Sequence, residues 1–414
     1  MNIRQKHQPK YRYRQRTHKR RFWLLIPLVA YSLGSILWPW HTISPEQTKN
    51  QLSITTPVAN LPWPAYGQAA FGTANPDRVL ASNGPQIPLA TASTTKVLTA
   101  LVILSKKPLK PGADGPAIPI TDADVAIYNN YVAQDGSVTP VIAGASLTQR
   151  EMLEALLLPS ANNVADTLAI WAYGSLAGYK SAAQEYLKQH GLTQTTVGSD
   201  ASGLAPDSVS TARDLVKLGG LAMEEPVVRE IVGKSQATIS GVGQVNNVNS
   251  LLGKNGIIGI KTGNNDQNPG AFMGATTVTQ NGKTATLLTA IMGAPSLAQA
   301  LADSNNLLAA ARTTVADTVI VRKGDVLGNY NLPAGGRVQA IAAADLHTTL
   351  LRGDTVTVYL ELEPIAYTTK SSEKVGTARL PKTSLGSEAA IAIVLKDAPA
   401  QPSIFWRLAH PLGQ

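Results

Sequence analysis

A serine and a lysine three positions apart, Ser93 and Lys96, are the residues of this 414-residue sequence best suited to nucleophilic chemistry. Residues at i and i+3 of a helix lie on one face, so the Ser93 hydroxyl would lie within reach of the Lys96 amine. A lysine amine can take a proton from serine when burial or a nearby cation lowers its pKa. If Ser93 begins the helix, free backbone N–H groups would also favour a developing oxyanion beside it.

Composition excludes most competing chemistries. The chain has no cysteine, which excludes disulfides, cysteine nucleophiles and thiolate metal sites. The six histidines show no metal-ligand spacing, and none stands beside a plausible nucleophile. The sequence has no G-x-S-x-G motif. We therefore expect no metal and no cofactor, and a mechanism that does not use histidine.

Single short motifs are weak signals in this chain. Ser-x-x-Lys occurs at Ser93–Lys96 and again at Ser371–Lys374, and Ser-x-Asn occurs at Ser160–Asn162 and Ser304–Asn306. Lys-Thr-Gly occurs once, at Lys261–Gly263. The three motifs that begin at Ser93, Ser160 and Lys261 are more informative as an ordered set, separated by 67 and 101 residues. The predicted contexts, a helix start, a helix–helix loop and a strand led by residues 257–260, also agree with a shared site.

This ordered set resembles the signature of penicillin-binding proteins and serine β-lactamases. Longer segments are similar to the D-alanyl-D-alanine carboxypeptidase family, which comprises low-molecular-mass penicillin-binding proteins of the peptidase S11 type. The resemblance covers about residues 60–400. The matching segments are 91–100, 156–163, Gly203-Leu204, 210–214, 249–252 and 259–263.

The resemblance implies a β-lactamase/DD-peptidase-like α/β fold, an antiparallel sheet flanked by helices, followed by a small all-β domain. It also implies a serine-type D-Ala-D-Ala carboxypeptidase that acts on peptidoglycan stem peptides ending in D-Ala-D-Ala and is inhibited by β-lactam antibiotics. The implied catalytic residues are Ser93 as nucleophile, Lys96 as base, and Ser160 and Asn162. The implied substrate-binding residues are Lys261, Thr262 and Gly263.

Three positions depart from the family's pattern. Asn264-Asn265-Asp266 follows Lys-Thr-Gly where the family usually has a residue and then Thr. Val248 stands where many members carry an arginine between two asparagines, and Ala294-Pro295-Ser296 lacks the arginine found elsewhere. These departures concern recognition of the substrate carboxylate and leave the substrate preference open.

Three alternative functions remain at this point. A class A β-lactamase needs a deacylating glutamate in an E-x-x-L-N loop, but Glu224-Glu225-Pro226 is followed by Val-Val-Arg. A DD-transpeptidase would share the acylation of Ser93 and differ only in the acceptor. A non-catalytic wall-binding protein on the same fold would more readily have lost Ser93, Lys96 or Lys261.

Periodicity predicts the organisation of the folded part. We expect a catalytic domain over 65–314, a small β domain over 315–400 and a tail over 401–414 that packs on the β domain or touches a membrane surface. In the first domain we expect helices at 92–104, 148–158, 162–177 and 211–223, and strands at 66–72, 78–81, 276–279 and 284–292. In the second we expect strands at 318–321, 337–341, 355–362, 374–379 and 391–394.

The N-terminal region is strongly basic and then apolar. Residues 1–21 hold nine of the 36 Lys and Arg residues and no acidic residue, so the other 27 balance the 27 Asp and Glu. Residues 22–40 predict an uncleaved membrane anchor, with a cleaved signal segment as the alternative, and 41–64 predict a linker. We expect a cell-membrane protein with an extracytoplasmic catalytic domain. A nucleic-acid-binding arm is the weakest interpretation of the basic tail, and we expect no nucleic-acid partner.

Overall fold

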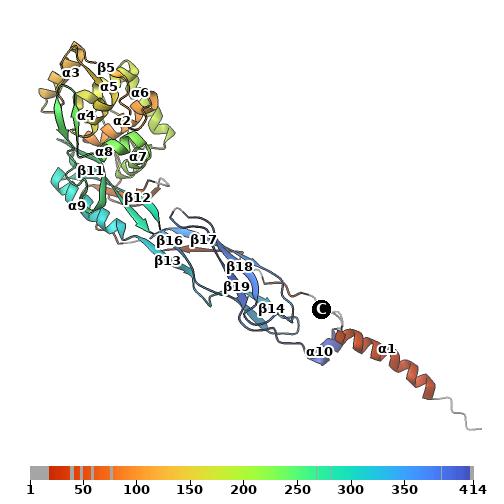
Figure 1. The fold of residues 1–414 in the computed structure, drawn as a ribbon. Helices are drawn as coiled ribbons and strands as arrows, with labels where there is room; N and C mark the ends of the chain where they lie inside the picture. Colours follow the sequence, from red (N-terminus) through yellow and green to blue (C-terminus); the bar gives the residue numbers. More distant parts are fainter. Residues whose placement is uncertain are drawn as a thin grey trace, which may run out of the picture.

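The computed structural model describes residues 18–37, 42–46, 50–56, 60–74, 78–266, 268–280, 282–383 and 385–410. The molecule is elongated: an α/β unit (residues 60–312) lies at one end, a β region (residues 313–400 with strand β1) follows, and helices α1 and α10 lie at the other end (Figure 1).

A five-stranded antiparallel sheet forms the centre of the α/β unit, in the order β10-β11-β12-β2-β3. The predicted strands 66–72 and 78–81 are confirmed as the pair β2–β3, and 276–279 and 284–292 as the hairpin β11–β12; all except β2 are longer than predicted. Asn75–Asp77 and Asn281, in the two turns, lie outside the described residues. The strands are β2 (Gln68–Thr73), β3 (Arg78–Asn83), β10 (Ile257–Asn265), β11 (Asn268–Gln280) and β12 (Lys283–Ala294).

Helices cover both faces of this sheet. Side chains alternate across β12, so that Leu288 packs in the larger core on the side of helix α7 while Leu287 packs on the side of helix α9. The antiparallel sheet flanked by helices confirms the predicted fold class. The helices are α2 (Thr95–Lys106), α3 (Asp122–Val132), α4 (Gln149–Leu157), α5 (Asn162–Tyr173), α6 (Leu176–Gln189), α7 (Ala212–Glu224), α8 (Pro226–Val232) and α9 (Leu297–Arg312).

Short strand pairs and one further turn complete the unit. They are β4 (Leu89–Ala90) with β7 (Val209–Ser210), β5 (Ala117–Pro119) with β6 (Ser146–Thr148), β8 (Gln236–Ile239) with β9 (Gly243–Asn246), and the 3₁₀ turn η2 (Lys254–Gly256).

Two helix boundaries differ from the sequence prediction for local reasons. The helix predicted from residue 92 begins with a separate 3₁₀ turn, η1 (Ala92–Thr94), because Ala92 has a positive φ of 46°. The helix predicted over 162–177 ends at Tyr173, where Gly174 takes the left-handed conformation and Ser175 caps the next helix. The helix predicted at 148 begins as expected, with a capping box between Thr148 and Glu151.

The C-terminal part is all-β, as predicted. A six-stranded antiparallel sheet has the order β1-β17-β18-β19-β15-β14, and β13 pairs with β16. Alternation buries one side of β17, where Val356, Val358 and Leu360 join the local core. Its strands are β13 (Val315–Val321), β14 (Val326–Asn331), β15 (Arg337–Ala342), β16 (Leu346–Leu351), β17 (Thr355–Leu362), β18 (Lys374–Leu380) and β19 (Ala389–Leu395), of which β14 and β16 were not predicted.

Part of the segment expected as a linker is a strand instead. β1 (Gln51–Thr55) pairs with β17 at the edge of the six-stranded sheet, and Ile43 makes an isolated bridge with Ile365. Leu52 and Ile54 pack against the core of the β region. The alternation of these two residues is too short to stand out among the prolines that surround it, whereas the sheet edge gives it partners.

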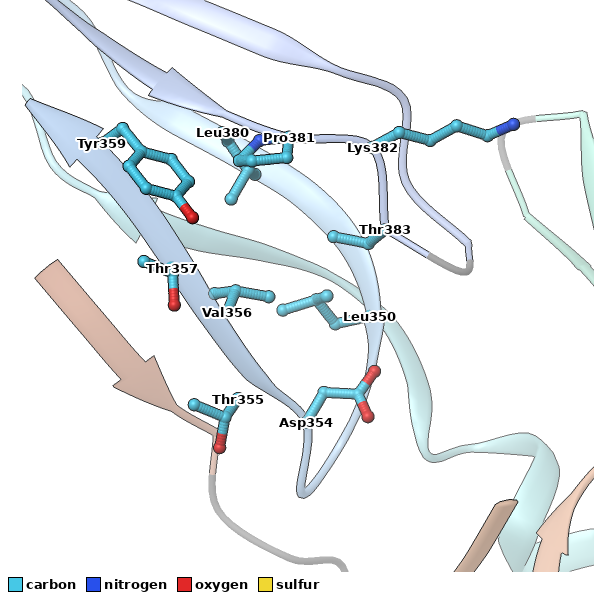
Figure 2. A pocket seen from close by; sticks show the side chains of 10 residues that line it. All are labelled: Leu350, Asp354, Thr355, Val356, Thr357, Tyr359, Leu380, Pro381, Lys382 and Thr383. Atoms are coloured by element: carbon cyan, nitrogen blue, oxygen red, sulfur yellow. The ribbon is translucent and has the colours of Figure 1, made fainter. Parts of the chain in front are cut away.

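The α/β unit and the β region share a small apolar junction. Phe71, Leu287 and Leu307 from the unit pack with Val315 and Leu351 from the β region. Close to this junction, the β region holds a cavity of about 280 Å³ lined by β16, β17 and residues 380–383, with the carboxylate of Asp354 at one end (Figure 2).

Helices α1 (His18–Leu37) and α10 (Ile404–Ala409) lie beside each other at the end farthest from the α/β unit (Figure 1). The Tyr31 hydroxyl donates to the Leu408 carbonyl at 2.8 Å. α1 includes most of the segment predicted as a membrane anchor, and residues 38–41 lie outside the described part. Among the helices that the structure describes, none combines the length and the apolar character needed to cross a membrane.

Candidate active site

Two of the predicted site residues, Ser93 and Asn162, lie at a cleft of about 880 Å³ in the α/β unit, and the buried amine of Lys96 contacts both of them. Ser93 and Asn162 line it, together with residues 134–137 after α3, Gly203-Leu204, and residues 264–266 that follow Lys-Thr-Gly on the edge strand β10. The walls therefore come from the turn before α2, the start of α5 and the end of β10, as the motif contexts predicted.

Hydroxyl groups of the neighbouring threonines fix the turn that carries Ser93. The Thr94 hydroxyl donates to the Thr91 carbonyl at 2.7 Å, and the Thr91 hydroxyl donates to the Ser208 carbonyl at 2.9 Å. Since Thr91 has donated its proton, the Thr95 hydroxyl, 2.6 Å away, donates to Thr91. These bonds hold the turn in an irregular geometry that helix propensity alone would not produce.

The amine of Lys96 is fully buried and has three oxygen neighbours. Lys96 Nζ lies 2.7 Å from Ser93 Oγ, 2.7 Å from Asn162 Oδ1 and 3.1 Å from the carbonyl oxygen of Ser202. Desolvation, with the charge of Lys261 as a second cause, holds the pKa of Lys96 well below its usual range. A neutral amine has two N–H groups, so with these on Asn162 and Ser202 its lone pair faces the Ser93 hydroxyl.

Lys261 is the second buried amine of the site. It lies on β10, and its Nζ donates to the Thr262 carbonyl at 3.2 Å. Burial lowers the pKa of Lys261 to about 7, so near neutral pH this amine is partly protonated. A Cβ on the next residue but one, Gly263, would meet the Thr91 carbonyl at 3.0 Å and Thr94 N at 3.2 Å. The glycine thus allows β10 to pack closely on the turn that carries Ser93.

Ser160 is placed on the loop between α4 and α5, two residues before Asn162, and is buried. Its φ of 70° lies in the left-handed region, which is uncommon for a serine and is typical of residues held by their surroundings. Within the described part of the chain, the Ser160 hydroxyl takes no part in the hydrogen bonds that join Ser93, Lys96 and Asn162. The structure therefore joins these three directly and places Ser160 on the loop before α5, two residues from Asn162.

Sequence reasoning missed the carboxylates behind Lys96. The Asp200 side chain accepts from the backbone N–H groups of Ser202, Gly203 and Ala205 at 2.6–2.7 Å and so shapes the turn that presents the Ser202 carbonyl to Lys96. A second carboxylate close to this turn, that of Asp166 on α5, is buried, whereas Asp200 is partly exposed. In the sequence, this turn was indicated only by the family-like Gly203-Leu204 pair. The apolar periodicity of the predicted helix over 162–177 gave no indication that Asp166 would lie near Lys96.

The residues that depart from the family's pattern have structural contacts of their own. Asn265 Oδ1 accepts from Asn268 N at 2.8 Å, closing the turn between β10 and β11. Ser296 caps helix α9 through the backbone N–H of Gln299. Val248 is exposed and does not line the cleft.

The fold and site define a DD-peptidase-like protein, and comparisons with known proteins agree. A solved structure of a peptidoglycan synthesis regulatory factor (PBP3) from Streptococcus pneumoniae matches 80% of this chain and 98% of its own, with a TM-score of 0.56 at 22% identity. This likeness shows a shared fold. Residues 68–296 match the sequence model of Peptidase_S11, D-alanyl-D-alanine carboxypeptidase, so the chain belongs to this family.

Relatives within the family differ in the reaction that their names describe. The chain is 31% identical over 226 residues to the D-alanyl-D-alanine carboxypeptidase DacB2 of Mycobacterium tuberculosis, covering 53% of this chain and 74% of that protein. It is 26% identical over 188 residues to the D-alanyl-D-alanine endopeptidase of Escherichia coli, covering 45% of this chain. That match spans 56% of the relative, little more than half of its length.

Proposed function

We propose that this chain is a serine-type D-Ala-D-Ala carboxypeptidase that removes the terminal D-alanine from peptidoglycan stem peptides. The observation that carries the proposal is the 2.7 Å approach of the Lys96 amine to Ser93 Oγ, with the other acceptors of that amine already supplied by Asn162 and Ser202. A buried neutral amine with its lone pair on a serine hydroxyl is a base poised for nucleophilic catalysis.

The proposed reaction has two steps. Ser93 Oγ bonds to the carbonyl carbon of the penultimate D-alanine as its proton passes to Lys96, and the amide bond breaks as the leaving nitrogen takes a proton. D-Alanine leaves, and an ester remains on Ser93. Water then attacks the ester carbon and gives up a proton to the same base; the bond from this carbon to Ser93 Oγ breaks, Ser93 takes the proton back, and the shortened peptide leaves as a carboxylate.

The other site residues have roles that suit their positions. The backbone N–H groups of Ser93 and of the strand near Gly263 would stabilise the oxyanion, and β10 would pair with the peptide backbone. Lys261 and Thr262 would bind the terminal carboxylate, for which a cation in a dry cleft is well suited. Asn162 would hold the substrate amide, and Ser160 would relay the proton to the leaving nitrogen.

Penicillin would acylate Ser93 in the same way and leave slowly. Rapid hydrolysis of such an ester needs a second base, and Glu225, the nearest candidate in the sequence, instead caps helix α8 through Val227 N at 3.2 Å. We therefore expect the penicilloyl ester on Ser93 to be long-lived, as in a penicillin-binding peptidase and unlike a β-lactamase. A DD-transpeptidase remains the alternative, because it would use the same acylation with an amine as acceptor.

The test measures D-alanine release by the full chain from a peptide ending in D-Ala-D-Ala. Ser93→Ala should abolish release and capture of fluorescent penicillin, whereas Ser371→Ala, in the second Ser-x-x-Lys copy, should retain both. Penicillin capture without D-alanine release would favour the transpeptidase. If neither occurs with the unaltered chain, the proposal is wrong and a binding protein remains.

We also propose that the N-terminal segment holds the chain at the cell membrane, with the folded regions outside the cytoplasm. Nine basic residues precede the apolar stretch, and the apolar side chains of Leu28 and Leu33 on α1 and Phe405 on α10 are exposed. The two helices lie together at one end of the molecule (Figure 1). The full chain should co-sediment with anionic lipid vesicles, and Leu28→Glu with Leu33→Glu should release it. A chain that stays in the supernatant would contradict this proposal.

A further inference from the structure

A buried carboxylate with no part in the proposed mechanism lies behind the base. Asp166 is 6% exposed and stands four residues after Asn162 on α5, hence on the same face of that helix. Its Oδ2 accepts from the Tyr131 hydroxyl at 2.7 Å, and its Oδ1 accepts from the backbone N–H of Ala201 at 2.9 Å. A buried carboxylate is costly to desolvate even with these two hydrogen bonds, so a structural account alone would favour an apolar residue here.

The contact with Ala201 leads directly to Lys96. Ala201 precedes Ser202, whose carbonyl is one of the acceptors of the Lys96 amine. The Thr99 hydroxyl donates to the Ala201 carbonyl at 2.7 Å, so the two peptide groups that flank Ala201 are held by α2 and by α5. Removing the bond from Asp166 would therefore loosen the carbonyl that orients the amine of Lys96.

The charge of Asp166 also acts on Lys96. The ionisable groups that bear on Lys96 come from several elements: Lys261 from β10, Asp200 from the 198–208 loop and Asp166 from α5. Burial, with the charges of the same carboxylates as a further cause, raises the pKa values of Tyr131 of α3 and Tyr179 of α6, so both phenols are neutral. Burial raises the pKa of Asp166 to about 6, and it is mostly ionised at neutral pH.

We propose that Asp166 is a positioning residue for the base, which fixes the Ser202 carbonyl against Lys96 and offsets the positive charge that Lys261 places nearby. The inference rests on the proposed function of Ser93 and Lys96. Asp166 does not touch the substrate. It acts through Ala201 and through its charge.

The experiment measures the rate of acylation of the full chain by fluorescent penicillin from pH 5 to pH 9. Acylation needs the neutral amine, so the rate rises with pH through the pKa of Lys96. Asp166→Asn removes a negative charge that raises the pKa of Lys96. The rising limb of the pH–rate profile, where the acylation rate increases with pH, should therefore move to lower pH by about half a unit or more. The maximal acylation rate should fall several-fold because the Ser202 carbonyl is less well held.

A matched control lies on the same pair of helices. Asp124 of α3 is also buried and accepts from the Thr167 hydroxyl of α5 at 2.9 Å. Its charge is not among those that shift the pKa of Lys96. Asp124→Asn should leave the rising limb in place, even if it lowers the melting temperature. A limb that moves equally in both variants would mark a general structural effect and overturn the inference.

The remaining outcomes are also decisive. An unchanged limb in Asp166→Asn would overturn the inference while the proposed function stands, whereas failure of the unaltered chain to be acylated would overturn both. If Asp166→Asn does not fold, Tyr131→Phe serves instead: it removes one hydrogen bond from the carboxylate, makes its ionisation less favourable and should move the limb the same way by a smaller amount. No movement in that variant would also contradict the inference.

Discussion

The α/β unit and the β region each contain a Ser-x-x-Lys sequence, and the two copies end in opposite environments. Lys96 is fully buried, with its amine 2.7 Å from Ser93 Oγ. Lys374 is the exposed first residue of β18, and the Ser371 hydroxyl donates to the Lys396 carbonyl at 2.9 Å. The same spacing thus gives a desolvated base in one region and a solvated cation in the other.

The two Ser-x-Asn copies differ in the same way. Asn162 reaches Lys96 from the start of α5. On α9, Ser304 is buried against the sheet while Asn306 is exposed, so the two side chains do not share a site. Motif spacing identifies residues whose side chains could contact each other. Packing of the surrounding helices and strands determines whether these side chains are buried together in one site.

The largest expected effect comes from removing each lysine amine. Lys96→Ala should lower the rate of Ser93 acylation by penicillin by about 10³-fold, within the range lost when a general base is removed. Lys374→Ala should leave the rate unchanged, because its amine is in solvent. Stopped-flow or gel-based acylation rates check both. A comparable loss of acylation rate in the two variants would contradict the conclusion that Lys96, and not Lys374, is the base.

A pH profile of the enzymatic rate tests whether the two buried amines of the α/β unit titrate as the structure indicates. For a peptide with a terminal carboxylate, kcat/KM should rise as Lys96 loses its proton and fall above about pH 7 as Lys261 loses its own. Lys261→Arg keeps its charge at all these pH values, so the falling limb should disappear even if activity drops. A falling limb that persists in Lys261→Arg would assign it to another group.

The smallest expected effect concerns stability. The pKa of Lys261 is about 7 in the folded protein and about 10.5 when exposed, so below pH 7 the folded state carries the full cost of a buried ammonium. Lys261→Met should therefore raise the free energy of unfolding by about 1–4 kcal/mol near pH 7, with the gain shrinking towards pH 10.

Lys374→Met is the matched control in the β region and should change the free energy of unfolding by less than about 0.5 kcal/mol. Denaturant titrations at pH 7 and pH 9.5 provide the measurement. A destabilised Lys261→Met protein would mean that this amine contributes more to the fold through its contacts than its desolvation costs.

Much of the fold could be predicted from local patterns. The hairpin of β11 and β12, the α4 capping box and the alternation in β17 are all visible in the sequence. The strand β1 was not predicted, because its pairing partner β17 lies some 300 residues away in the chain. Helix α9 lacked a clear apolar stripe, since small alanines provide much of its contact with the sheet.

The order of the three motifs, the residue types able to perform acylation, and the succession of an α/β unit and an all-β region could all be inferred from the amino-acid sequence. The burial of Lys96, the exposure of Lys374 and the placement of Asp166 and the Ser202 carbonyl near the base became apparent only from the packing of the folded chain. The physical reason is that desolvation and long-range electrostatic interactions depend on packing between elements far apart in the chain. Local periodicity specifies the elements but not the environment they create together.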